Sequence, residues 1–344
     1  SCVAFDGENY YTSSFTELGE FWKYDKDGKL IERFRLPDMY FPVYDLTFDG
    51  RYFYGSDGTN RIFKFDFYNK RVADIITVAD ESDLEITHCC YDPDLGALWI
   101  GGWNTLGLVD MSGKVISSIM AFDPTTTLSV IGSAYDNVSP GGPYLWLADG
   151  QSSENMIDCV TIYQYDINKG RLTGVKHATV DIPGYKIGDA TTGVNKLGGL
   201  SSSLDIADGK LTLTGVLQQS PSLIFNYTLC DVDKWITMLP KHGTLQPGDS
   251  QEITFNFSSS DAKNGDKLST AAELLTLPEL GAKTFAFNMN VNADAVAPKP
   301  VNLKAEPGVA SVTLSWQQGD ANRTPKGYNV YRDGQKVNGE TVTG

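Results

Sequence analysis

The feature that most constrains this chain is a two-residue motif, an aromatic residue followed by aspartate, that recurs at an almost constant interval. Its four copies are separated by 43, 43 and 44 residues and stand at Phe5-Asp6, Phe48-Asp49, Tyr91-Asp92 and Tyr135-Asp136. A period of about 40 to 50 residues is typical of chains built from equivalent supersecondary units that stack side by side. We therefore expect several copies of one unit, each of which buries its apolar faces only against its neighbours.

Each copy carries the same internal pattern. The motif is followed by a glycine turn, an aromatic-rich strand, an alternating strand that ends in aspartate, and a basic residue that opens a last apolar strand. In the second copy these parts are 51–55 (RYFYG), 63–66 (FKFD) and Arg71. The alternation and the tight turns predict four antiparallel strands per copy, with aspartates that accept hydrogen bonds from turn N–H groups. Strands without helices at this period predict a β-propeller.

The repeat weakens towards residue 229. A degenerate fifth copy has its second strand at 210–214, and no fourth strand follows residues 222–229. The missing strand would come from upstream of Ser1, or this blade has three strands. Five blades are visible, and a sixth would require upstream sequence. The segment 179–199, rich in glycine and threonine, is expected to be a loop insertion, and the propeller is placed at residues 1–229.

A different pattern begins after the propeller. From Trp235 the chain reads W-x4-P-x2-G-x-L-x-P-G and then alternates apolar residues from Ile253 to Phe257. The segment 230–297 resembles an immunoglobulin-like (Ig-like) module common in secreted bacterial proteins. The resemblance implies a β-sandwich whose core Trp235 would fill.

The segment 298–344 begins with alternating prolines that suit a stiff linker. Beyond them, Trp316 and the pattern Tyr328-x-Val330-Tyr331 resemble the opening strands of a fibronectin type III domain. The segment spans roughly half of such a domain. The expected fold class is therefore all-β, with a β-propeller followed by an Ig-like β-sandwich and a partial fibronectin type III-like sandwich.

Composition excludes several classes of partner and site. The formal net charge is -15, which repels a phosphate backbone, so we expect no nucleic-acid partner. The sequence has no run of about 18 apolar residues, so we expect no transmembrane segment. The five cysteines are an odd number without C-x-x-C spacing, which argues against a structural zinc site and implies no disulfide framework.

We predict no catalytic residues, no metal site and no cofactor. Only three histidines are present and no two are close in sequence, which disfavours metal or Ser/His/Asp chemistry. The segment 34–37 (FRLP) is similar to the F/Y-R-I-P motif of sialidases, but the repeat places Arg35 on the outermost strand of its blade. The segment 25–28 (DKDG) looks like the start of a calcium loop, yet it lacks a glutamate at the twelfth position and fits a hairpin turn.

A propeller usually binds its ligand at one face, with the loops that enter the innermost strands and those between the second and third strands. Large aromatic residues in such loops need a packing partner or a ligand. Polar residues in the same loops could supply the few convergent groups that a ligand pocket needs. The predicted ligand-binding residues are Tyr40, Asp57, Trp103, Asn104, Asp149 and Gln151.

These features predict a noncatalytic extracellular or cell-surface protein of bacterial type, with a role in binding or adhesion. The propeller would recognise a protein or a glycan, and the two C-terminal modules would act as spacers. Two alternatives stay open: an extracellular hydrolase or lyase acting on glycans or peptides at the propeller channel, and a purely structural spacer. Clustered carboxylates or a metal in the channel would favour the enzyme.

Overall fold

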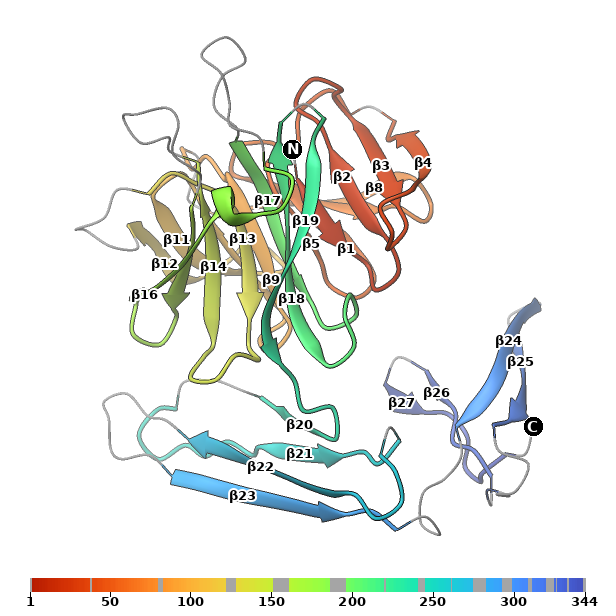
Figure 1. Cartoon of the computed structure of the whole chain (residues 1–344). Coiled ribbons are helices and arrows are strands. Elements are labelled where there is room, and N and C mark those ends of the chain that lie inside the picture. Colours follow the sequence, from red (N-terminus) through yellow and green to blue (C-terminus); the bar gives the residue numbers. More distant parts are fainter. Residues whose placement is uncertain are drawn as a thin grey trace. The chain divides into compact units, whose positions relative to one another are not determined.

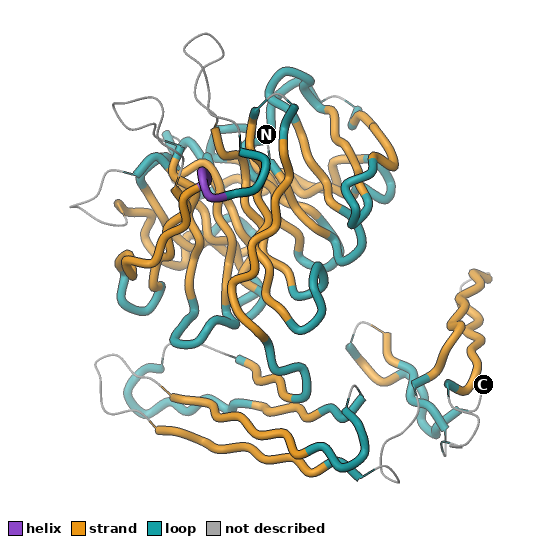
Figure 2. The backbone as a smooth tube through the Cα atoms, in the orientation of Figure 1, coloured by secondary structure: helices purple, strands orange, loops and turns teal. Residues whose placement is uncertain are grey.

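The computed structural model is built almost entirely from β-strands. Among the residues it describes, the only helix is η1 (Thr179–Asp181), a short 3-10 helix (Figure 2). In this part of the chain no helix has the length and apolar character needed to cross a membrane. The described residues are 2–37, 39–79, 83–121, 128–150, 161–185, 196–219, 221–240, 245–260, 262–274, 283–292, 299–308, 311–319, 325, 327–332 and 334–342.

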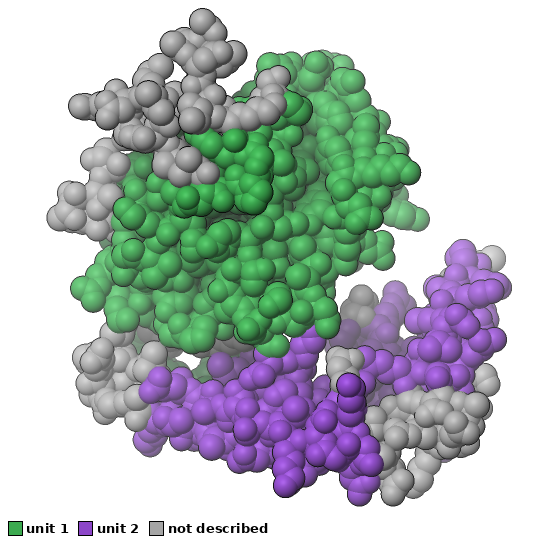
Figure 3. All heavy atoms as spheres, viewed as in Figure 1, with its two compact units in different colours: residues 1–232, 239–253 green, residues 233–238, 254–344 purple. Residues whose placement is uncertain are grey.

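The chain divides into two compact units, coloured separately in Figure 3. Unit 1 comprises Ser1–Val232 and Leu239–Ile253, and unit 2 comprises Asp233–Met238 and Thr254–Gly344. All four copies of the aromatic-aspartate motif lie in unit 1.

The described residues of unit 1 form five antiparallel sheets, which we number as blades 1 to 5 (Figure 1). Blades 1 to 4 have four strands each, and blade 5 has three. Blade 1 consists of β1 (Val3–Phe5), β2 (Tyr10–Ser13), β3 (Glu20–Tyr24) and β4 (Leu30–Arg35). Blade 2 consists of β5 (Leu46–Phe48), β6 (Phe53–Ser56), β7 (Arg61–Asp66) and β8 (Arg71–Thr77). Blade 3 consists of β9 (His88–Asp92), β10 (Ala97–Gly101), β11 (Thr105–Asp110) and β12 (Val115–Ala121). Blade 4 consists of β13 (Val130–Asp136), β14 (Tyr144–Asp149), β15 (Thr161–Asp166) and β16 (Arg171–Ala178), and blade 5 of β17 (Lys196–Ser203), β18 (Lys210–Gln218) and β19 (Leu223–Asp231).

The first strands of the five blades form a closed ring. Strand β1 contacts β5, β5 contacts β9, β9 contacts β13, β13 contacts β17, and β17 contacts β1. The predicted β-propeller is therefore confirmed, with five blades. Among the described residues blade 5 has three strands. The predicted end of the loop 179–199 is wrong, because β17 starts at Lys196. This strand is the innermost strand of blade 5.

Five clusters of buried side chains among the described residues lie between successive blades. The cluster between blades 1 and 2 is rich in aromatic rings, and the ring centroid of Phe67 lies 4.6 Å from that of Phe21 and 4.5 Å from that of Phe53. The cluster between blades 5 and 1 is the smallest, with Val3, Phe5, Tyr10 and Val216 buried. Most of the recurring aromatic residues are thus packing residues between blades, as the alternation of apolar side chains requires.

The repeated aspartates hold the turns of each blade. In blade 4, Asp136 Oδ1 accepts hydrogen bonds from the N–H groups of Val138 (3.0 Å) and Ser139 (2.9 Å), and its Oδ2 accepts one from the indole of Trp146 (3.0 Å). In blade 3, Asp92 accepts in the same way from its turn and from Trp99. The motif recurs because one carboxylate satisfies a tight turn and anchors an aromatic side chain of the next strand.

Unit 2 contains paired strands with a small aromatic core. Trp235 is buried, its ring centroid lies 6.2 Å from that of Phe257, and Phe257 packs on Phe287 at 5.8 Å. Farther along the chain, Trp316 meets Tyr328 edge to face at 5.5 Å. The pairs are β20 (Ile236–Leu239) with β21 (Thr254–Phe257), β22 (Lys267–Leu274) with β23 (Lys283–Asn290), β24 (Pro300–Gly308) with β25 (Ser311–Gln318), and β26 (Tyr331–Arg332) with β27 (Gln335–Lys336).

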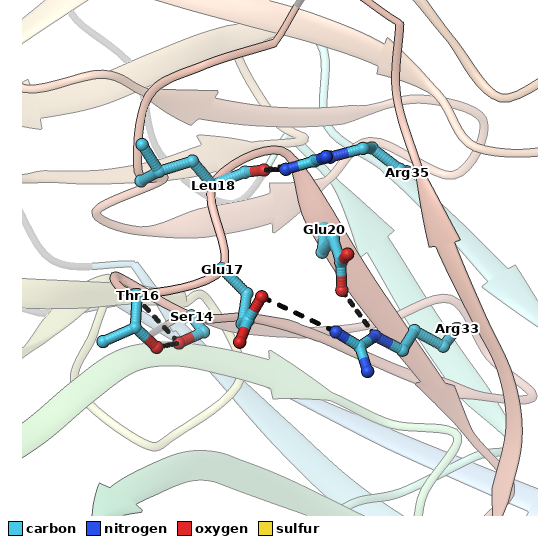
Figure 4. A network of polar contacts seen from close by, with 7 residues as sticks. All are labelled: Ser14, Thr16, Glu17, Leu18, Glu20, Arg33 and Arg35. Atoms are coloured by element: carbon cyan, nitrogen blue, oxygen red, sulfur yellow. Dashed lines mark hydrogen bonds and ion pairs between the residues drawn. The ribbon is translucent and has the colours of Figure 1, made fainter.

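The two motifs that resembled functional sequences have structural roles. Arg35 lies on β4, the outermost strand of blade 1, and donates a hydrogen bond of 2.7 Å to the carbonyl oxygen of Leu18 (Figure 4). Asp25 closes the hairpin between β3 and β4, since its carboxylate accepts from the N–H groups of Asp27 and Lys29. Neither segment faces the axis of the ring.

We predict that Asp136→Ala lowers the free energy of unfolding by about 2–4 kcal/mol. The substitution removes the acceptor of two turn N–H groups and leaves the buried indole N–H of Trp146 without a partner. Urea unfolding followed by circular dichroism measures the loss. The control is Asp27→Ala in an exposed turn, for which we expect a change within about 0.5 kcal/mol. Equal losses in the two variants would contradict this role of the motif.

Candidate functional site

The axis of the propeller is closed around one carboxyl group, that of Asp45. Its side chain is fully buried, and Oδ2 accepts hydrogen bonds from the N–H groups of Cys89 on β9 (3.1 Å) and Ser133 on β13 (2.8 Å). The N–H of Leu46 on β5 donates to Oδ1 (3.0 Å), and that of Leu200 on β17 also donates to the carboxyl group. Asp45 therefore joins four of the five innermost strands.

Space at the axis is limited by the fifth blade. A Cβ atom added to Gly199 on β17 would overlap with Oδ1 of Asp45 and approach the backbone of Cys2 and Val3 to 3.2 Å. Glycine is required at this position because β17, Asp45 and the start of blade 1 meet there. Burial raises the pKa of Asp45 from 3.8 to about 8, and the N–H groups that it accepts from oppose the rise.

The other titratable groups at the axis also have structural partners. His88 is fully buried, its Nε2 donates to the carbonyl of Thr105 (3.0 Å), and its Nδ1 accepts from the hydroxyl of Ser133 (3.2 Å). Burial lowers the pKa of His88 to about 4, so the imidazole is neutral near pH 7. Burial raises the pKa of the Cys2 thiol to about 11 and that of the Cys89 thiol well above its usual value. These groups are held protonated or neutral as part of the core.

The loops that enter the innermost strands and those between the second and third strands lie at one end of the ring, which we call the entry face. A row of three aromatic rings lies here. Phe15 meets Tyr44 edge to face with ring centroids 5.0 Å apart, and Tyr44 meets Trp103 in the same way at 6.4 Å. We call these three residues the aromatic row. Phe15 comes from blade 1, Tyr44 from the loop into blade 2, and Trp103 from blade 3.

Trp103 is the most exposed member of the row, with 43% of its surface accessible. Its indole N–H donates a hydrogen bond of 3.1 Å to Glu85 in the loop that enters blade 3. Its carbonyl oxygen accepts from the N–H of Val130 at the start of β13 (2.7 Å). The side chain of Trp103 is therefore bonded to a neighbouring loop and its backbone to the first residue of β13.

Two further predicted residues lie beside the row. Asp57 forms an ion pair with Arg61 and accepts from the N–H of Thr59 (3.1 Å). The next glycine, Gly58, has φ of +83° and lies against the ring of Tyr44, so the loop of Asp57 contacts the row. Asn104 follows Trp103, and its buried Oδ1 has no hydrogen-bond partner among the described residues.

The remaining predicted residues do not join this group. Tyr40 is 74% exposed and lines a separate hollow of about 230 Å³ with Arg35, Pro37 and Met39. Asp149 ends β14, and its Oδ1 accepts from the N–H of Ser129 (2.9 Å), which makes it part of a loop connection. Gln151 lies outside the described residues. The structure thus brings together Asp57, Trp103 and Asn104 of the predicted set.

Sequence reasoning missed four residues that the structure makes prominent: Asp45, Phe15, Tyr44 and Glu85. The repeat contains a signal for Asp45. Four residues before each motif aspartate, blades 1 to 4 have Cys2, Asp45, His88 and Gly132, so a carboxylic acid occurs at this position in blade 2 alone of these four. No comparable signal marks the aromatic row, because Phe15 and Trp103 lie in loops between second and third strands whereas Tyr44 lies in a loop that enters an innermost strand.

No protein-family model matches the sequence, and no curated protein matches it. Among solved structures, glutaminyl cyclase from Myxococcus xanthus is similar, with 14% sequence identity and a TM-score of 0.46. The match covers 67% of this chain and 91% of that one. The protein is defined by its fold as an all-β protein with a five-bladed β-propeller.

We predict that Asp45→Asn destabilises the protein by about 2–3 kcal/mol near pH 4.5, because an amide nitrogen cannot accept from the N–H groups around it. The pKa of Asp45 is higher in the folded state, about 8, than its usual 3.8. The stability that this group contributes is therefore present below pH 4 and is lost as the pH rises through 8.

The difference in unfolding free energy between the natural protein and Asp45→Asn should accordingly shrink from pH 4.5 to pH 8.5. Urea unfolding of both proteins at several pH values measures this difference. The contributions of the other titrating groups are the same in both proteins and cancel in the subtraction. A difference that widens with pH would show that the N–H groups lower the pKa of Asp45 more than burial raises it.

Proposed function

We propose that this is a noncatalytic binding protein whose propeller recognises an extracellular protein or glycan through its entry face. The aromatic row is the observation that carries the proposal. Exposed aromatic side chains held by fixed hydrogen bonds supply large contact areas without losing much conformational entropy on binding. Trp103 has this combination, because it is 43% exposed and is tied to Glu85 and Val130.

The partners of the axial groups support a binding role over an enzymatic one at the channel. A catalytic acid or base must reach a substrate proton. Asp45 and His88 are fully buried, and their polar atoms bond to the backbone and side chains of the innermost strands. These bonds suit a structural role in closing the ring.

The C-terminal region is proposed to act as a spacer that presents the propeller outside the cell. We propose domain limits of 1–229 for the propeller, 230–297 for an Ig-like module and 298–344 for part of a fibronectin type III-like module. The tryptophan motif and the packing of Trp235 on Phe257 support the second assignment, and the packing of Trp316 on Tyr328 supports the third. Localisation at the cell surface or in the medium is proposed from the resemblance of the segment 230–297 to a module common in secreted bacterial proteins.

We predict that the full chain binds at least one member of an array of glycans and extracellular proteins. Trp103→Ala should abolish most of the signal, because it removes the exposed ring of the row. The matched control is Trp22→Ala, which removes a partly exposed tryptophan on β3 that lies over the guanidinium of Arg33. The control should bind as the natural protein does. Absence of binding to every glycan and every protein on the array would contradict the proposal. Hydrolysis of a test glycoside or peptide would favour the alternative, an extracellular hydrolase or lyase.

A further inference from the structure

The chemistry around Trp103 narrows the class of ligand. We propose that the aromatic row binds a neutral glycan, one sugar ring of which stacks on Trp103 while its hydroxyl groups donate to the carboxylate of Glu85. This inference rests on the proposed function, since it names the ligand class of the same surface.

The first support is the rigid placement of the Trp103 ring. The indole N–H is fixed by Glu85 at 3.1 Å, and the backbone is fixed by Val130 at 2.7 Å. Tyr44 meets the ring edge to face at 80°. A sugar ring has an apolar C–H surface of a size that matches an indole. A stacking platform that is already ordered binds such a surface at a lower entropic cost than a mobile one.

The second support is the free acceptor capacity at the edge of the platform. Glu85 is exposed, and among the described residues the indole of Trp103 is the hydrogen-bond donor to its side chain. A carboxylate can accept about four hydrogen bonds. The equatorial hydroxyl groups of a sugar project close to the plane of its ring, so a sugar stacked on Trp103 would present them to a carboxylate that already accepts from the indole N–H.

The third support is the charge and spacing of the groups around the row. Glu85 and a chain with a net charge of -15 disfavour acidic glycans, since like charges repel. Arg61, the cation at the nearby loop, is paired with Asp57. The rings of the row lie 5.0 and 6.4 Å apart, which is packing distance, so they support each other rather than enclosing a cage for an ammonium group. A neutral ligand with an apolar face and a polar rim fits this surface best.

The test is isothermal titration calorimetry of the full chain with neutral hexasaccharides of gluco, manno, galacto and xylo configuration. Oligogalacturonate and oligolysine are titrated in parallel as acidic and cationic probes. At least one neutral hexasaccharide should bind. Trp103→Ala should weaken that binding by about thirty-fold, as the loss of a central aromatic contact does. Glu85→Gln should weaken it by about ten-fold through the loss of a charged acceptor, and Trp22→Ala should leave it unchanged. Circular dichroism confirms that each variant is folded.

The outcomes separate this inference from the proposed function. Binding of a neutral hexasaccharide that survives in Trp103→Ala would overturn the site. Binding of oligogalacturonate or oligolysine alone would overturn the ligand class. Failure of all hexasaccharides, combined with a protein ligand on the array that depends on Trp103, would overturn the inference and leave the proposed function standing. If no binding is detected in any of these experiments, both the inference and the proposed function are overturned.

Discussion

The carboxyl group of Asp45 is the contact on which the arrangement of the propeller depends. A ring of blades has no continuous sheet to hold it together, because hydrogen bonds between strands stop at the edge of each blade. Asp45 directly precedes β5 and supplies bonds that cross these edges, since it accepts from backbone N–H groups of β9, β13 and β17. Gly199 lets the fifth blade approach the same atom and the start of blade 1. One buried side chain thus links the innermost strands of four blades.

The same contact also positions the candidate binding surface. Tyr44, the central ring of the aromatic row, directly precedes Asp45 and is held by a hydrogen bond from its N–H to the carbonyl of Ser56 (3.1 Å). Its neighbours Phe15 and Trp103 come from the loops between the second and third strands of blades 1 and 3. The row exists only when blades 1, 2 and 3 stand at their correct spacing around the axis. Ring closure and the surface are therefore two consequences of one arrangement.

The sequence predicted the parts of this molecule that repeat and missed the parts that occur once. The spacing of the aromatic-aspartate motif was enough to predict blades and their strands. In every copy the aspartate accepts hydrogen bonds from the N–H groups of the turn that follows it. Trp103 and Asp57 could be predicted, since their loops have a fixed place in the repeat. Phe15 lies in an equivalent loop of blade 1, but its contact with Tyr44 could not be predicted, and neither could Tyr44 or Glu85, because these contacts join different blades across long stretches of chain. The repeat identifies equivalent positions in the blades. It does not show which of the residues that differ between blades come into contact in the folded protein.

The asymmetry of the ring supports the proposed position of the binding surface over blades 1 to 3. The junction between blades 5 and 1 has the smallest buried cluster, and polar contacts such as Asn226 Nδ2 to the hydroxyl of Tyr10 (2.7 Å) supplement it. The junction between blades 1 and 2 is filled by aromatic rings at contact distances. Local opening is easiest where few apolar contacts are made. A surface that must present Trp103 in one orientation is therefore expected over the well-packed junctions, which is where the aromatic row lies.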